Sequence, residues 1–198
     1  MHPNRKFQIT DREEMAALVR ATGFGPIVVA TPDGLRAVHV PVLLDGDRLR
    51  FHVSRGNATY ASLVGGCEAL FIAEGAHAYV SPDWYGIPDR VPTWSYVAVE
   101  LNGQVRPLGS DALVRMLDEI SAEHESRLAP KEPWSRAKMS ASRFESLVKA
   151  IGGFEMEISA WRGTCKIDQD KPPEVRMRLA EALAERGEAA VAALVRPG

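Results

Sequence analysis

Long apolar runs are missing from this sequence of 198 residues. No segment approaches the roughly 18 consecutive apolar residues that a membrane-spanning helix needs, which argues against a helical membrane protein. The first residues, MHPNRKFQITDREE, also lack the apolar stretch of a secretory signal. We therefore expect a cytoplasmic protein with no membrane partner.

Cysteine is scarce, with 2 residues in the chain. Cys67 and Cys165 belong to no C-x-x-C pattern, and each lies in an apolar-rich run, so we expect buried thiols instead of metal ligands or a disulfide. The histidines form no H-x-H or H-E-x-x-H pattern, and no serine has the surroundings of an activated nucleophile. The sequence therefore indicates neither a metal centre nor a catalytic triad.

Neither sign of charge dominates, because 24 Lys and Arg residues stand against 26 Asp and Glu residues. The formal net charge is −2 and the pI is about 6.2. Such a chain is unsuited to a strong, sequence-independent grip on nucleic acid, so any DNA contact would have to be local. The most basic segment, residues 131–149, has the composition of a solvated helix face, and we find no helix-turn-helix pattern.

Short runs with a two-residue apolar period predict strands joined by tight turns. Such runs lie at residues 25–31, 35–45, 48–55, 67–74, 94–108 and 154–161. Residues 76–81 form either the next strand after 67–74 or its continuation. Asn102-Gly103 is compatible with either a hairpin turn or a bulge.

Helical spacing appears at both ends of the chain and in the second half. Thr10 and Glu13 have the spacing of a capping box and predict a helix to about Ala21, ended by Gly23 and Gly25. Asn57 can cap a short helix. Further helices are expected from Ser110 or Asp111, over residues 142–151, and from Pro172-Pro173 to about Val195 with an interruption near Gly187.

Early strands, late helices and no β-α-β rhythm predict a mainly β protein with attached helices (α+β). The expected architecture is an antiparallel barrel of six or seven strands. We expect one domain over residues 1–198, with a helical C-terminal extension from about residue 171. A dinucleotide-binding sheet is disfavoured, because Gly23-Phe24-Gly25 lacks the third glycine and precedes a strand.

The most distinctive segment runs from residue 75 to residue 96, GAHAYVSPDWYGIPDRVPTWSY. It places 3 Tyr, 2 Trp, 1 His and 3 Pro in 22 residues. Tyr and Trp offer flat apolar faces together with a polar group, which suits a planar heteroaromatic ligand. A loop whose aromatic residues plug a barrel end or line a dimer contact would explain the same composition.

A second candidate region follows the strand RLRFHVSR. Strand alternation places His52 and Ser54 on one face, and the segment ends in Arg55, Gly56 and Asn57 at an expected helix start. A hydroxyl, a guanidinium and free helix N–H groups together can hold a phosphate, although an ordinary turn with a surface arginine has the same sequence. His39 and Pro41 share the less apolar face of a neighbouring strand, where Pro41 suggests a sheet edge or an approach by something other than a strand. Near the C-terminus, Lys166 and Gln169 could reach a ligand or be solvated.

Taken in order, the blocks FQITD, GLRAVHVPVLLD, LRFHVSRGN, GAHAYVSPDWY, VPTWSYVAVELNG and GFEMEIS…KIDQDK resemble the PaiB-like family of FMN-binding negative transcriptional regulators. The resemblance spans about residues 5 to 180. It implies a split-barrel flavin-binding domain, Greek-key-like in topology, that forms a homodimer with FMN at the subunit contact. Two segments depart from the family pattern: Ser95 stands where Asn is usual, and Asp168 and Asp170 stand where Ser and Asn are usual. The added carboxylates predict weaker FMN binding or a different ligand.

The resemblance also assigns site residues by position. Those expected on the phosphate and ribityl side are His52, Val53, Ser54, Arg55 and Asn57, with Lys166 and Gln169 as contributors. Those expected around the ring are Tyr79, Ser81, Trp84, Tyr85, Thr93 and Trp94, with His39 and Pro41 on the neighbouring strand.

The resemblance implies a negative regulator that acts on DNA directly or through another protein. The alternative is an FMN-dependent oxidoreductase, in which the cofactor supplies the chemistry and the protein positions it. A binding module that has lost its cofactor is the third possibility.

Overall fold

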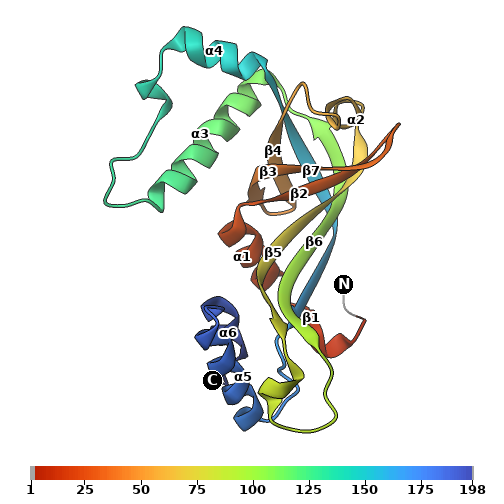
Figure 1. Cartoon of the computed structure of the whole chain (residues 1–198). Helices are drawn as coiled ribbons and strands as arrows, with labels where there is room; N and C mark the ends of the chain where they lie inside the picture. The colour runs from red at the N-terminus through yellow and green to blue at the C-terminus, as the bar shows by residue number, and fades with distance from the viewer. Residues whose placement is uncertain (1–2, 198) are drawn as a thin grey trace. The chain divides into compact units, whose positions relative to one another are not determined.

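The computed structural model describes residues 3–197 (Figure 1). Its strands form one seven-stranded sheet in the order β1-β7-β4-β3-β2-β5-β6, and β7 also pairs with β6. All strands except β1 therefore close into a ring, which confirms the predicted mainly β architecture with attached helices. The strands are β1 (Gln8–Ile9), β2 (Phe24–Thr31), β3 (Gly34–Asp45), β4 (Arg48–Ser54), β5 (Cys67–Val80), β6 (Thr93–Pro107) and β7 (Ile151–Lys166).

Helices precede, interrupt and follow the strands. No helix within residues 3–197 is long and apolar enough to cross a membrane. The α-helices are α1 (Arg12–Thr22), α2 (Tyr60–Val64), α3 (Ser110–Ser126), α4 (Ala141–Lys149), α5 (Pro173–Glu185) and α6 (Ala189–Val195), and the short 3-10 helices are η1 (Arg5–Phe7), η2 (Pro82–Tyr85) and η3 (Arg136–Lys138).

The strands β2, β3 and β4 form the predicted antiparallel meander. Tight turns join them because Gly34 and Gly46 adopt positive φ angles of 99° and 56°, which side chains disfavour. β4 then pairs with β7, and this register sets Phe51 opposite Phe154. Their rings stack with centroids 5.6 Å apart, and both side chains are fully buried. The predicted alternation thus gives each strand one face toward the core.

Two open questions about the strands are resolved by their length. β5 is continuous from Cys67 to Val80, so residues 76–80 continue the strand instead of starting a new one. β6 runs through Asn102-Gly103 without a hairpin turn. A Cβ atom at Gly103 would lie 2.2 Å from the carbonyl oxygen of Glu157. This glycine is required because the β7 backbone passes too close for a side chain.

The N-termini of two helices differ from the predicted caps. Asp11, instead of Thr10, caps α1: its Oδ1 accepts the N–H of Glu13 at 2.7 Å and of Glu14 at 3.4 Å. Asn57 was predicted to cap α2, but the N-cap is Thr59, with no capping hydrogen bond from a side chain; Asn57 Oδ1 instead accepts the N–H of Thr59 itself. At the other end, Gly187 with φ 83° separates α5 from α6, as predicted. The expected extension reaches residue 198, which lies outside the described residues.

The chain forms two compact units, each built from discontinuous segments. The first contains the chain up to Leu18, Glu74–Val99, and the chain from Arg162 onward; the second contains Val19–Ala73 and Glu100–Trp161. In the first unit, α5 and α6 pack their apolar sides against Val80 and Tyr85. In the second, Leu43 contacts the buried side of α3. The organisation as one domain stays a prediction.

Cys67 and Cys165 are free thiols that are only partly buried. Burial raises the pKa of both thiols. Both are therefore mainly protonated near neutral pH.

Candidate functional site

Three large aromatic side chains of the first unit lie together, and we call Tyr79, Trp84 and Trp94 the aromatic surface. Tyr79 comes from β5, Trp94 from β6 and Trp84 from η2. The ring of Tyr79 meets Trp94 edge to face, with centroids 5.8 Å apart, and Trp84 at 6.4 Å. Trp94 is 50% exposed and Tyr79 is 44% exposed. Large apolar faces held in fixed positions at the surface are typical of a binding site.

A cavity of about 420 Å³ adjoins the aromatic surface. Its walls come from the exposed faces of β5 and β6: Glu74, His77, Trp94, Tyr96, Val97 and Ala98. This volume lies within the range of about 300–1,000 Å³ that is usual for small-molecule sites. The cavity combines a flat apolar wall with a carboxylate and an imidazole, as a polar heteroaromatic ligand requires.

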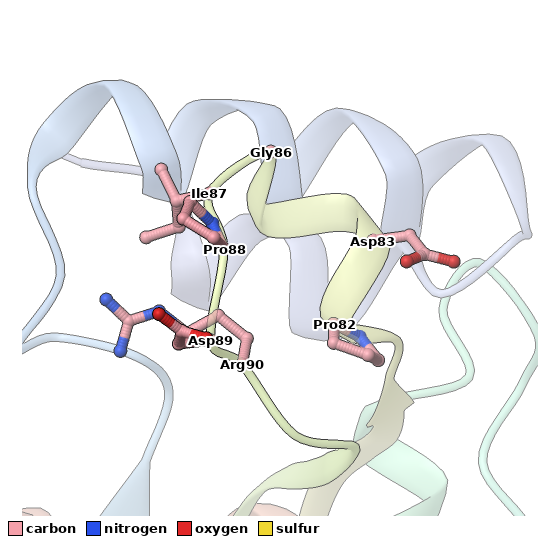
Figure 2. Close-up of a pocket in the computed structure, with 7 residues that line it drawn as sticks. All are labelled: Pro82, Asp83, Gly86, Ile87, Pro88, Asp89 and Arg90. Carbon is pink, nitrogen blue, oxygen red and sulfur yellow. The ribbon is translucent and has the colours of Figure 1, made fainter.

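A larger open hollow of about 450 Å³ lies along the loop that follows β5 (Figure 2). The sticks in Figure 2 place Asp83 on one side and Asp89 with Arg90 on the other. No aromatic side chain lines this hollow. It therefore offers a planar ligand no stacking partner.

Two residues expected beside the ring serve the fold. Tyr85 is buried in the core formed with α5 and α6. The carbonyl oxygen of Tyr85 accepts hydrogen bonds from the Arg178 guanidinium at 2.8 and 3.3 Å. Ser81 caps η2 by accepting the N–H of Asp83 at 3.4 Å. Neither side chain is part of the aromatic surface.

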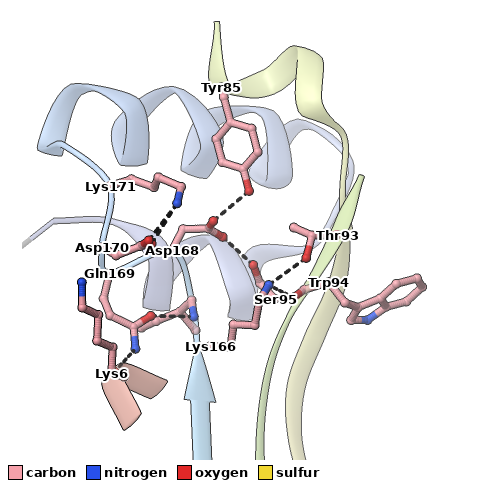
Figure 3. A network of polar contacts seen from close by, with 11 residues as sticks. Lys6, Tyr85, Thr93, Trp94, Ser95, Lys166, Asp168, Gln169, Asp170 and Lys171 are labelled. Carbon is pink, nitrogen blue, oxygen red and sulfur yellow. Dashed lines mark hydrogen bonds and ion pairs between the residues drawn. The ribbon is translucent and has the colours of Figure 1, made fainter. Parts of the chain in front are cut away.

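Asp168 is the central acceptor of a buried network (Figure 3). Its Oδ1 accepts the hydroxyl of Tyr85, and its Oδ2 accepts the hydroxyl of Ser95, both at 2.7 Å. Asp168 is 5% exposed and Ser95 is fully buried. Burial raises the pKa of Tyr85, and the Asp168 carboxylate adds to the effect. The sequence predicted that this carboxylate would weaken FMN binding; in the structure its oxygens accept hydroxyl groups of the protein, which leaves its charge in place.

Lys166 lies beside this network and is partly buried. Its Nζ donates to Thr93 Oγ1 at 2.8 Å and to the carbonyl oxygen of Trp94 at 2.6 Å (Figure 3). Desolvation lowers the pKa of the ammonium group, while nearby Asp168 and Asp170 act in the opposite direction. Lys166 therefore holds the start of β6 and fixes the backbone that carries Trp94.

Gln169 closes the turn after β7. Its Nε2 donates to the carbonyl oxygens of Cys165 at 2.6 Å and Lys6 at 3.3 Å, and its Oε1 accepts the N–H of Ile167 at 2.9 Å. Both ends of the amide are thus used within the first unit. Asp170 in turn pairs with Lys171 at 2.9 Å, so this carboxylate is neutralised locally.

A cavity of about 210 Å³ opens next to Lys166. Three cationic residues and three aspartates are among its lining residues: Arg90, Lys166, Lys171, Asp89, Asp168 and Asp170. The formal charges of these six side chains cancel.

In the second unit, β4 ends at the second predicted region. Val53 is buried in the core, His52 is half-buried, and Ser54 and Arg55 are exposed, as the strand alternation predicts. The Arg55 Nη1 donates to the Tyr60 hydroxyl at 2.6 Å, and its guanidinium lies 5.4 Å from the centre of that ring. One contact leaves most of the five guanidinium N–H donors available to a ligand.

The backbone of this turn differs from the expectation of free N–H groups. The N–H groups of Arg55, Gly56 and Asn57 already donate to Ala150 O, Ser54 Oγ and Ser54 O. The Asn57 Oδ1 accepts from Thr59. An anion here would have to be held by side chains, with Arg55 and Ser54 the accessible ones.

His39 and Pro41 lie in β3, where the valines at 38, 40 and 42 are buried as predicted. The registers pair residues 34–41 with β2 and residues 42–45 with β4, so the pairing partner changes at Pro41. Exposed His39 stacks with Phe24, with ring centroids 6.1 Å apart. β3 is internal in the strand order, so Pro41 marks a change of partner instead of an edge strand.

His52 has a buried Nδ1 without a hydrogen-bond partner in the second unit. Burial lowers the pKa of this imidazole from its ordinary value of 6.5. The unfolded chain therefore takes up the proton at a higher pH than the folded chain does. The stability that neutral His52 contributes is present above about pH 6.5 and is lost as the pH falls.

We expect His52→Gln to reduce this acid sensitivity, because glutamine does not titrate. The urea midpoint of unfolding is measured at about pH 7.5 and at about pH 5.5. The drop in midpoint between the two pH values should be smaller in the variant than in the parent. His77→Gln, at an exposed histidine, is the matched control and should behave like the parent. An equal loss in His52→Gln and the parent would contradict this assignment.

Sequence reasoning missed the Asp168 network. Its members are 73 and 83 residues apart in the chain, and no local pattern joins them. The available signal was that Ser95 and Asp168 both depart from the family pattern that the sequence resembles.

Comparisons with known proteins identify the family of the chain and relatives of its fold. Residues 1–160 match the model of a family described as "Putative FMN-binding domain". The chain is 27% identical over 187 residues to the protease synthase and sporulation protein PAI 2 of Bacillus subtilis, covering 92% of this chain and 89% of that protein.

Solved structures share the fold. A FAD- and heme-binding protein from Mycobacterium smegmatis superposes with a TM-score of 0.59 at 18% identity, over 80% of this chain and 73% of that chain. The flavocytochrome Anf3 from Azotobacter vinelandii gives a TM-score of 0.57 at 15% identity, over 83% and 72% of the two chains. These likenesses confirm the predicted split-barrel fold. The family match over residues 1–160 shows that the chain belongs to the FMN-binding domain family, for which FMN is the cofactor.

Proposed function

We propose that this chain is an FMN-binding negative regulator of transcription that works as a homodimer. The observation that carries the proposal is the exposed aromatic surface in a chain of the FMN-binding family. The likeness to PAI 2, a protein named for protease synthesis and sporulation, supports a regulatory role.

The aromatic surface fits an isoalloxazine ring. Tyr79 and Trp94 present apolar area, and their edge-to-face contact fixes the orientation of both rings. Glu74 and His77 in the adjoining cavity can bond to polar ring atoms. We expect these residues to bind and orient the ring, while the bound flavin would supply any redox chemistry.

The end of β4, taken by itself, carries groups that suit a phosphate. Arg55 offers a charge-assisted hydrogen bond, and the neighbouring Ser54 hydroxyl is exposed. The His52 Nδ1 is buried, so it lies out of reach of a ligand at this surface. Val53 would contribute only through its backbone, because its side chain belongs to the core.

Exposed apolar residues support self-association. Phe24 is 50% exposed, and Leu35 and Val91 are more than 70% exposed. Side chains of this kind are commonly covered in a homodimer. Sedimentation equilibrium of the FMN-loaded protein should give the mass of two chains.

Trp94→Ala should weaken FMN binding by about 0.5–1.5 kcal/mol, the usual contribution of an aromatic pair beyond area burial. This corresponds to about a twofold to twelvefold higher Kd, measured by quenching of flavin fluorescence. Trp134→Ala removes a tryptophan from the α3–α4 connection and should leave the Kd unchanged. If both substitutions raise the FMN Kd equally, Trp94 does not belong to the FMN site.

The regulatory role needs a separate test. A gel-shift titration on the DNA upstream of the protein's own operon, at two salt concentrations, should give a salt-sensitive complex if repression is direct. Without such a complex, repression would require another protein. Anaerobic mixing of the FMN-loaded protein with NADH or NADPH tests the oxidoreductase alternative, because rapid flavin bleaching would favour an enzyme.

A further inference from the structure

An apolar cavity of about 320 Å³ lies in the second unit, within the segment that contains α3 and α4. Apolar side chains form most of its surface, while Asp118, Ser121 and Arg136 are its polar members. The lining residues are Leu117, Asp118, Ser121, Trp134, Arg136, Met139, Phe144, Leu147, Val148, Ala150 and Ile151. The cavity has room for about ten water molecules at about 30 Å³ each, which is the size of a small organic ligand.

The floor of the cavity belongs to the core, but its walls do not. Leu117, Val148 and Ile151 pack against the buried cluster around Met116. In contrast, α4 has no buried residue, and Leu147 remains 41% exposed. A helix of this amphipathic pattern leaves apolar area in water unless something covers it.

Hydrogen bonds hold the outer wall in place. The N–H of Trp134 donates to a carboxylate oxygen of Glu125 at 2.8 Å, and the Lys131 ammonium pairs with the same carboxylate. The Lys138 ammonium donates to the carbonyl oxygen of Pro133 at 2.9 Å. The connection between α3 and α4 is thus tied to α3 at the point where it supplies Trp134.

Arg136 is fixed at the edge of the cavity. Its Nη2 pairs with Asp118 Oδ2 at 3.1 Å, and its guanidinium lies 4.9 Å from the centre of the Phe144 ring. These two contacts orient the planar group and leave further N–H donors on it. An oriented guanidinium beside an apolar cavity matches a molecule with a carboxylate at one end.

We propose that this cavity binds a small amphipathic carboxylate, with its apolar body between α3 and α4 and its carboxylate on Arg136. The cavity shares no lining residue with the aromatic surface, and Arg55 is linked to it by the hydrogen bond from its N–H to the carbonyl oxygen of Ala150. The proposal does not rest on flavin binding.

Isothermal titration of the full-length, FMN-loaded protein with octanoate and with 1-octanol tests the proposal. Ser121→Leu should fill the cavity with a larger side chain. Ser126→Leu is the matched control, because each serine hydroxyl donates to a carbonyl oxygen of α3, at 2.8 Å for Ser121 and 2.7 Å for Ser126. We expect octanoate to bind one site per chain. Ser121→Leu should weaken it by about tenfold or more, and Ser126→Leu should have no effect.

Arg136→Gln separates charge from shape. It should weaken octanoate by about tenfold, equivalent to the loss of one hydrogen bond, and should leave 1-octanol unchanged. Absence of saturable octanoate binding, or equal affinity in Ser121→Leu and Ser126→Leu, would overturn the proposal. A change of sedimenting mass in Ser121→Leu would also overturn it, since the cavity would then be covered by a second copy of the chain.

Discussion

Asp168→Ala should lower the free energy of unfolding by about 2–4 kcal/mol, because it leaves two buried hydroxyl groups without their acceptor. Asp168 receives the hydroxyls of Tyr85 and Ser95 at 2.7 Å each, in a nearly dry environment. It also has a φ of 59°, a conformation that aspartate and asparagine tolerate better than alanine does. Urea denaturation of the parent and the variant measures the difference.

Three further substitutions separate the contributions. Asp168→Asn keeps the backbone preference and an acceptor oxygen, so about 1 kcal/mol should be lost. Tyr85→Phe removes one of the two hydrogen bonds and should cost about 1–2 kcal/mol. Tyr79→Phe, at an exposed tyrosine, is the matched control and should stay within about 0.5 kcal/mol of the parent. If Asp168→Ala also stays within that limit, Asp168 does not organise this region.

Arg55→Ala should weaken FMN binding by about 1.5–3 kcal/mol, which is the usual range for a hydrogen bond to a charged group. The Kd should therefore rise by about tenfold to 150-fold. The exposed guanidinium uses one donor on Tyr60 and keeps others for a phosphate. Titration of FMN fluorescence gives both dissociation constants.

Arg48→Ala provides the control for lost charge, because Arg48 is an exposed arginine on the same strand, β4. It should change the FMN Kd only slightly, and the change should be smaller still at high salt. An unchanged Kd in Arg55→Ala would assign Arg55 to the solvated surface. Riboflavin, which lacks the phosphate, should bind the parent and Arg55→Ala equally well.

Local pattern was sufficient for most of the fold. Strand alternation predicted which faces of β4 and β7 are buried, since Phe51, Val53 and Phe154 all point to the core. Glycine predicted the break between α5 and α6, because Gly187 adopts a φ that ends a helix.

Contacts between distant segments decided what the pattern left open. The sequence left both a hairpin turn and a bulge open at Gly103; the structure excludes the turn, because β6 continues past Gly103 beside the β7 backbone at Glu157. Similarly, Asp11 and Thr10 are both good capping residues, and the path of the chain into α1 selects Asp11.

The candidate site was predicted only in part, because contacts between distant segments also decide which of its side chains can meet a ligand. Residue type alone identified the exposed rings of Tyr79 and Trp94. Residue type did not indicate that the Gln169 amide forms hydrogen bonds within the turn after β7, or that Lys166 holds the start of β6. A polar side chain is available to a ligand only when the fold leaves its donors or acceptors unused, which depends on partners far away in the sequence.

Gel filtration of the purified protein after addition of FMN, with flavin absorbance followed across the protein peak, tests the central claim most directly. We expect flavin to co-elute with the parent, with Arg48→Ala and with Trp134→Ala, and to be depleted from the peaks of Arg55→Ala and Trp94→Ala. Flavin that elutes entirely free of the parent protein, or that co-elutes equally with all four variants, would contradict the account.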